Sequence, residues 1–247
     1  MKITPKTPQE SLDKALLRFR PTESKFEQFK TGLSELTSKI DEAKREDNQE
    51  IHVQNFLRDV FYKGISEVNK KGDIDLAIHL SSDAKSSVGV LIEAKRPGNK
   101  AEMLSAENPN TKAIHELVLY FMRERVDEEN NDIRYLIATN INEWFIFSAQ
   151  DFNHHFYVNK KFRTEYEAWR DDLKVSSNTP KLNLPKHIRP FTRIFSRFEK
   201  SYLIARIRVS TIGNFGRVFI GRNLINQRSF IPTSPNAIFL RGMKTGF

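Results

Sequence analysis

Three ionisable residues lie within two short apolar runs of the sequence. Asp75 lies in GDIDLAIHL (72–80), and Glu93 and Lys95 lie in VGVLIEAKRP (88–97). Apolar residues alternate in both runs, which predicts strands over residues 73–80 and 88–95 joined by a turn at SSDAKSS. If the turn centres on Ala84, Asp75 lies opposite Glu93, because each is nine residues from Ala84. Opposed residues in an antiparallel pair have Cβ atoms about 4.5–5.5 Å apart.

Two carboxylates at that spacing repel each other, and each raises the pKa of the other. A divalent cation relieves the repulsion, and Mg²⁺ prefers carboxylate oxygens, with Mn²⁺ as a substitute. Lys95 lies on the same strand face as Glu93, where it can hold a water molecule or a scissile phosphate. The pattern predicts a hydrolytic metal site for phosphodiesters. The alternative is that both acids are solvated strand ends and that Glu93 and Lys95 form a surface ion pair.

The remaining elements predict a mixed α/β domain. Pro8 after Thr7 predicts a helix start, and a second helix follows from Phe26, Phe29, Leu33, Leu36 and Ile40 at alternating spacings of three and four. Further elements are expected at about 48–62 (helix), 108–126 (helix), 132–140 and 143–150 (strands) and 160–174 (helix). Trp144, Phe145 and Phe147 are expected in the core, and His79 in a structural role.

Composition favours a polyanionic partner and excludes several classes of protein. The 247 residues carry a net charge of +9, which favours DNA or RNA. There are no cysteines, which excludes disulfides and thiolate metal sites and is typical of a cytoplasmic protein. We find neither a secretory signal nor an apolar run of about 18 residues, the length needed to span a membrane.

Four segments in order resemble a known family. DLAIHL, LIEAKRPGNKAEML, HELVLYFMRER and IATNINEWFIFSAQ are similar to segments of the PD-(D/E)xK nuclease superfamily. They most resemble the N-terminal nuclease domain of type IIG restriction–modification enzymes. The resemblance covers roughly residues 8–178. It implies a restriction-endonuclease-like mixed sheet core flanked by helices, with N-terminal helices.

The resemblance also implies roles for individual residues. Asp75 and Glu93 would be metal ligands, with the carbonyl of Ala94 as a further ligand, and Lys95 would position the attacking water and stabilise charge on the phosphate. An upstream helical glutamate often joins such a site. Glu50 is our choice, because it shares the apolar face of its helix, and Glu46 is the alternative. The superfamily's proline before the first aspartate is absent, since Ile74 precedes Asp75.

The resemblance predicts a nuclease domain over residues 1–178 and leaves 179–247 as a basic, acid-poor tail. Residues 201–247 contain seven Lys and Arg and no Asp or Glu, and show no sustained helical or strand period. The tail is either a DNA-binding extension or, as we favour, a frame-shifted and disordered segment. Full-length enzymes of this type continue into methyltransferase and target-recognition domains. Their motifs are missing, so the chain resembles an enzyme truncated before the methyltransferase.

The sequence therefore predicts a Mg²⁺-dependent DNA endonuclease domain of a restriction–modification system. The alternative is a non-catalytic DNA-binding or subunit-interaction module, an inactive fragment of such an enzyme.

Overall fold

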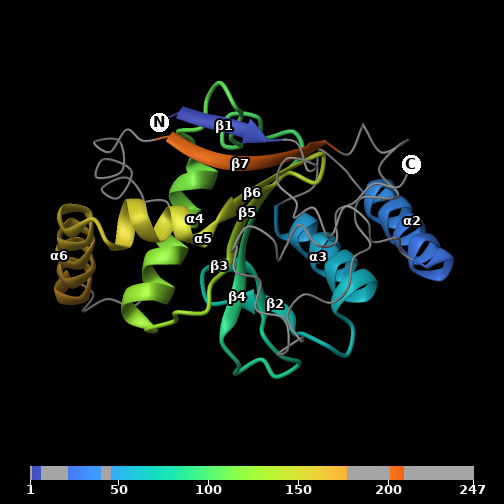
Figure 1. Ribbon diagram of the computed structural model, residues 1–247, viewed down its shortest axis with the longest axis horizontal. Helices are drawn as coiled ribbons and strands as arrows, with labels where there is room; N and C mark the ends of the chain where they lie inside the picture. Colours follow the sequence, from blue (N-terminus) through green and yellow to red (C-terminus); the bar gives the residue numbers. More distant parts are fainter. Residues whose placement is uncertain (1, 7–21, 40–45, 177–200, 209–247) are drawn as a thin grey trace.

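A computed structural model describes the backbone of residues 2–6, 22–39, 46–176 and 201–208 (Figure 1). Side chains are described for residues 22–39 and 49–171. The helix expected to start near Thr7 and most of the chain beyond 178 lie outside these residues.

The centre of the fold is a mixed sheet in the order β1-β7-β6-β5-β4-β3-β2. Strands β4 and β5 pair in parallel, as do β1 and β7, and the other neighbours are antiparallel. The strands are β1 (Lys2–Lys6), β2 (Val68–Lys71), β3 (Ile74–His79), β4 (Val88–Ala94), β5 (Tyr135–Thr139), β6 (Glu143–Ser148) and β7 (Ser201–Arg208).

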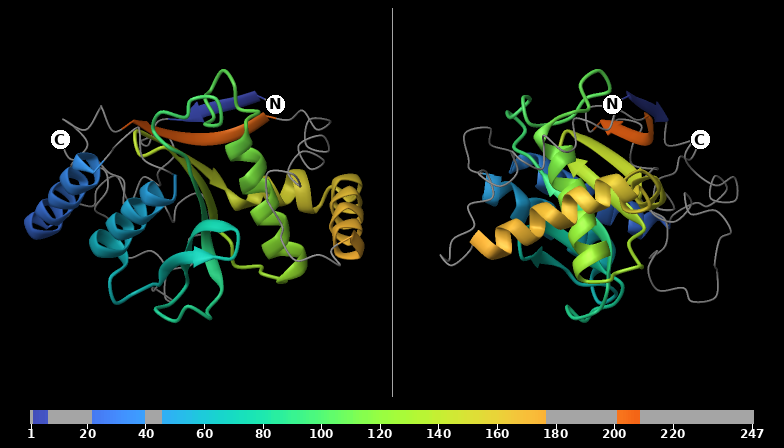
Figure 2. Two further views of the ribbon diagram at one scale, coloured as in Figure 1. Left: turned by 180° about the vertical axis from the view of Figure 1, so that it is seen from behind. Right: turned by 90° about the vertical axis from the view of Figure 1, so that its left-hand side faces the viewer.

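Helices cover both faces of the sheet, as the two views in Figure 2 show. One face carries α2 (Glu23–Ser38) and α3 (Glu46–Leu57), which continues as the π-helix η2 (Arg58–Tyr62). The other carries α4 (Lys112–Met122), η3 (Arg123–Asp127), α5 (Ala149–Phe152), η4 (Asn153–Tyr157) and α6 (Lys160–Ser176). The predicted α/β fold, a mixed sheet core flanked by helices, is confirmed.

The predicted register of the β3–β4 hairpin is confirmed. Leu76 pairs with Ile92 and Ile78 with Val90, which is the register that a turn centred on Ala84 requires. The register shifts by one residue after Ile78, so Gly89 has no partner on β3. Leu80 Cδ2 would lie 2.7 Å from a Cβ at position 89, which explains the glycine there.

Neighbouring residues of the β3–β4 hairpin alternate between the two hydrophobic cores on opposite faces of the sheet. Leu76 and Ile92 pack on the face of α3, whereas Ala77 and Leu91 pack on the face of α4. Residues two positions apart on a strand share a face. Asp75 and Glu93 therefore lie on the face that α4 covers.

The structure corrects the sequence-based description of the chain beyond residue 178. Residues 201–208 form β7, which pairs antiparallel with β6. The sheet thus includes a strand from the segment that sequence analysis described as lacking a strand period. Residues 177–200 and 209–247 lie outside the described part, so the boundary at 178 stays a prediction.

Core predictions at β6 are confirmed, because Trp144, Phe145 and Phe147 are all buried.

No helix in the described ranges is both long enough and apolar enough to cross a membrane.

The contact between α2 and η2 gives a first testable prediction. A Cβ added at Gly32 would overlap Val60 Cγ2. Gly32→Ala gains about 1 kcal/mol of helix propensity, but overpacking costs about 1–3 kcal/mol. We expect a net loss of about 1 kcal/mol in urea unfolding, whereas the exposed control Ser34→Ala should be neutral or stabilising. If Gly32→Ala proved more stable than the wild type, the two helices would not be packed this closely.

Candidate functional site

The site begins where β3 and β4 bring two carboxylates together. Asp75 Oδ2 accepts a hydrogen bond from the backbone N–H of Ala94 at 3.0 Å, which ties the Asp75 side chain to the end of β4. Glu93 precedes Ala94 and is 1% exposed. The backbone N–H of Lys95 donates to the Thr139 carbonyl at 2.7 Å, so the chain continues along β5 after β4 ends.

Lys95 is buried among carboxylates at this strand end. The residue is 3% exposed, and its Nζ forms ion pairs with Glu93 Oε1 and with Glu116 Oε2, the latter at 2.7 Å. Glu93 Oε2 is also buried, and the Glu93 carboxyl group interacts with the side chains of Tyr120 and Glu116 on α4. Asp75, Glu93 and Lys95 are therefore brought together as the sequence predicted.

Glu116 is the part of this cluster that sequence analysis missed. It lies on α4, where every residue from Ala113 to Met122 is buried, so the helix has no solvent face on which a glutamate could lie. Lys112, one turn earlier, has Nζ at 3.7 Å from Glu116 Oε1 and at 3.1 Å from Glu102 Oε2. The available signal was an acidic residue within an almost wholly apolar helix, since such a residue needs a buried cationic partner.

The electrostatics of the cluster favour protons or cations. Burial, and then the negative charge of Glu50, raise the pKa of Asp75 to about 7, although Lys95 and the Ala94 N–H act in the opposite direction. Burial raises the pKa of Glu93 well above its usual value despite the Lys95 ammonium. Burial is the largest single influence on Glu116 and would raise its pKa, but the charges of Lys95 and Lys112 and the hydrogen bonds with Glu93 and Lys95 together outweigh it, so the pKa is lowered.

Glu50 comes from α3, which covers the sheet face opposite to α4. It lies on α3, is buried, and its charge reaches Asp75. Its Oε2 accepts from Lys70 Nζ of β2 at 3.0 Å, an ion pair that includes neither Asp75 nor Lys95. The side chain of Glu46, the alternative to Glu50, lies outside the described residues.

The residues present fit a divalent cation by charge and by donor type. The carboxylates of Glu93 and Glu116 pair with one buried ammonium, that of Lys95, whose charge also acts on Asp75. Among the side chains of residues 22–39 and 49–171, no group of three or more His, Asp or Glu is arranged to hold a metal ion. The predicted ligand set is smaller, since it contains only the carboxylates of Asp75 and Glu93 and the carbonyl of Ala94.

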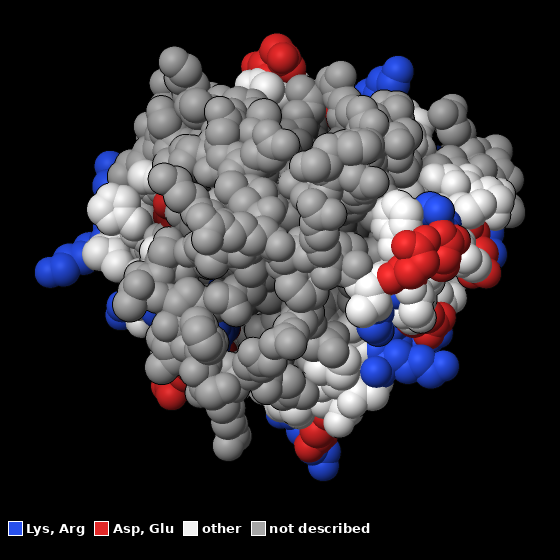
Figure 3. Space-filling model, turned by 45° about the vertical axis from the view of Figure 1, so that its right-hand side comes forward, with Lys and Arg blue, Asp and Glu red and all other residues white. Residues whose placement is uncertain are grey.

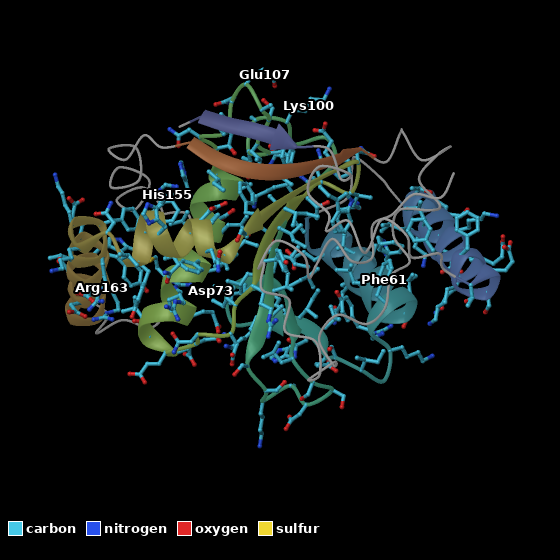
Figure 4. The ribbon with its side chains drawn as sticks, viewed as in Figure 1. Phe61, Asp73, Lys100, Glu107, His155 and Arg163 are labelled. Carbon is cyan, nitrogen blue, oxygen red and sulfur yellow. The ribbon has the colours of Figure 1, made fainter. Side chains whose placement is uncertain are left out.

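Other polar residues near the site have structural partners. Asp73 pairs with Arg123 at 2.8 Å and lies toward α4, whereas Phe61 lies on the α3 side (Figure 4). Arg125 donates to Asn153 and stacks on Tyr157. Both arginines therefore have partners within the protein.

His79 has the structural role expected of it. Its ring nitrogens lie 2.7 Å from the Ser86 carbonyl and 3.0 Å from Asn69 Oδ1, and the residue is buried.

Fold and site together define an α/β protein with a buried carboxylate–lysine cluster at the ends of adjacent central strands. The chain belongs to the family described as domain of unknown function DUF7149, whose model matches residues 6–193. That match extends past residue 178, where the resemblance to nuclease domains ended. Searches of curated proteins and of solved structures found no match.

Proposed function

We propose that this protein is a Mg²⁺-dependent DNA endonuclease domain of a restriction–modification system, with a restriction-endonuclease-like fold. The observation that carries the proposal is the meeting of Asp75, Glu93 and Lys95 at the ends of β3 and β4. Two carboxylates and an ammonium at this spacing provide ligands for a cation and a positive charge for a phosphate.

Each residue has a separate task in this proposal. Asp75, Glu93 and the carbonyl of Ala94 would hold the ion, which supplies Lewis-acid polarisation of the phosphate and a more acidic bound water. Lys95 stabilises the negative charge that develops on the phosphate and orients the attacking water. Glu50 adds negative charge beside Asp75 and so favours cation binding.

Burial of Lys95 argues for chemistry over simple DNA binding. A lysine that only contacts the DNA backbone works from the surface, where its ammonium stays hydrated. Lys95 is instead 3% exposed among acids, and burial of such a charge costs several kcal/mol per ion before pairing. This observation favours a role for Lys95 within a polar site over a role as a surface contact to the DNA backbone, and the cleavage assay below separates the enzyme from an inactive fragment.

DNA is proposed as substrate on the resemblance to restriction nucleases, because residues 1–200 carry 33 basic and 31 acidic residues and most of the net charge of +9 lies in residues 201–247. On the face in Figure 3, the Lys and Arg side chains of the described residues lie among Asp and Glu side chains. The sequence lacks the motifs of methyltransferase and target-recognition domains. We therefore assign sequence specificity to such domains in a partner, as in the type IIG enzymes that the sequence resembles.

The direct test is nicking of supercoiled plasmid. We expect the wild type to produce open circles with Mg²⁺ or Mn²⁺ and none with EDTA, at a rate that Glu128→Gln, an exposed control, leaves unchanged. If metal-loaded wild type at micromolar concentration binds the cation but never cleaves DNA, the non-catalytic module is the better description.

Calorimetry of Mn²⁺ binding tests the role of Glu50. Because its charge lies near Asp75, Glu50→Gln should weaken Mn²⁺ binding about tenfold, as loss of a residue around a metal site commonly does. Glu128→Gln again serves as the matched control and should bind Mn²⁺ like the wild type. Equal affinity of wild type and Glu50→Gln would remove Glu50 from the site.

A further inference from the structure

Lys95 has two carboxylate partners, and one of them, Glu93, is a proposed metal ligand. In the structure Nζ lies between two carboxylates, Glu93 Oε1 and Glu116 Oε2. A cation bound by Glu93 would compete with the ammonium for that carboxylate. Glu116 is then the carboxylate that remains in contact with Lys95.

The geometry of Glu116 suits this holding role. Its Oε2 is 2.7 Å from Lys95 Nζ, and its Oε1 faces Lys112 at 3.7 Å, so the two oxygens have different partners. The side chain is 5% exposed and lies on a helix that is buried from Ala113 to Met122. A carboxylate on such a packed helix cannot swing toward solvent without disturbing the core.

We propose that Glu116 is the positioning residue for Lys95, holding its ammonium at the end of β4 both before and after Glu93 binds a cation. The proposal deepens the proposed nuclease function and rests on it for its catalytic consequence. Its structural part, the hold on Lys95, stands on the metal-free contacts alone.

The structural part is tested by NMR of the lysine ammonium groups in the metal-free protein. A buried, ion-paired ammonium exchanges its protons slowly, so Lys95 should give a resolved Nζ signal that Lys95→Met assigns. Glu116→Gln keeps the size of the side chain and removes its charge, and we expect it to broaden or shift this signal. Glu102→Gln is the matched control, because Glu102 contacts Lys112 and has no ion pair with Lys95 in the described structure.

Addition of Mg²⁺ shows whether Glu116 or Glu93 keeps the Lys95 ammonium in place. If Glu116 holds Lys95, the wild-type signal should shift but persist at saturating Mg²⁺, whereas in Glu116→Gln it should disappear. A wild-type signal unchanged by Glu116→Gln, with or without Mg²⁺, overturns the proposal. Retained Mn²⁺ affinity in Glu116→Gln, within about threefold, is expected of a positioning residue, and a loss greater than about tenfold would make Glu116 a ligand instead.

The catalytic consequence is tested by a double-mutant cycle in plasmid cleavage. Glu116→Gln should lower kcat about 10²-fold with little change in KM, and should cause no further loss in a Lys95→Met background, because it acts through Lys95. Additive losses would contradict the proposal. If the wild type does not cleave while the NMR result holds, the nuclease function fails and the hold on Lys95 remains.

Discussion

Lys95→Met is expected to lower the free energy of unfolding by about 3–5 kcal/mol at about pH 8, because it removes the buried ammonium that pairs with Glu93 and leaves Glu116 only its longer contact with Lys112. Urea unfolding followed by circular dichroism measures the loss. The loss should shrink as the pH is lowered, because burial raises the pKa of Glu93 and a protonated carboxyl group carries no unpaired charge.

The matched control for this variant is Lys70→Met. Lys70 also pairs with a buried glutamate, Glu50, but its own side chain is 53% exposed. Because the Lys70 ammonium is more than half exposed, water can replace it beside Glu50, and its removal should cost no more than about 1 kcal/mol. Equal losses in the two variants would show that Lys95 is no more important to the fold than a surface lysine.

The same variant separates cleavage from metal binding. Lys95→Met should reduce plasmid cleavage about 10²–10³-fold, the usual loss when one charge-stabilising group is removed. Mn²⁺ affinity should be equal to or tighter than that of the wild type, because the ammonium no longer competes for Glu93. Weaker Mn²⁺ binding together with lost cleavage would indicate that the variant is damaged generally, which the stability measurement detects.

Asp75→Asn is expected to remove a large part of the pH dependence of stability. An aspartate in an unfolded chain titrates near about 3.9, whereas burial, followed by the charge of Glu50, raises the pKa of Asp75 to about 7. The folded state thus holds this proton more tightly. The stabilisation is complete below about pH 4 and is lost as the pH rises through about 7. Relative to Asp75→Asn, the wild type should lose up to about 4 kcal/mol across this range.

Asparagine keeps an oxygen for the Ala94 N–H, so the variant changes charge and little else. Urea titrations at a series of pH values measure the difference between the two proteins. Asp73→Asn, which alters an exposed residue paired with Arg123, is the control and should retain the wild-type slope. Parallel pH curves for wild type and Asp75→Asn would mean that Asp75 ionises as freely as on a surface.

A divalent cation should largely cancel this fall in stability with pH in the wild type. Cations bind the ionised carboxylates, so saturating Mn²⁺ stabilises the protein more at about pH 8 than at about pH 5. A free Mn²⁺ concentration about a hundredfold above Kd raises the free energy of unfolding by about 2.7 kcal/mol. Asp75→Asn should show little of this gain. A wild type indifferent to Mn²⁺ at both pH values would end the case for a cation at this site.

The sequence by itself determined the hairpin and the three residues it presents. Alternation within 73–80 and 88–95 fixed the strand faces, and the turn fixed the register, so the proximity of Asp75 and Glu93 followed from local rules. Lys95 followed from its place two residues beyond Glu93. Such relations span less than 25 residues, and they depend on backbone geometry rather than on the packing of distant elements.

Only the tertiary structure decided which helix completes the cluster and which strands complete the sheet. Glu116 reaches Lys95 because α4 packs across β4 and β5, and no periodicity in α4 states which strand end its glutamate will meet. Strand β7 joins β6 across more than 50 residues of chain. Contacts between elements distant in sequence depend on the mutual fit of whole faces, which local patterns do not encode.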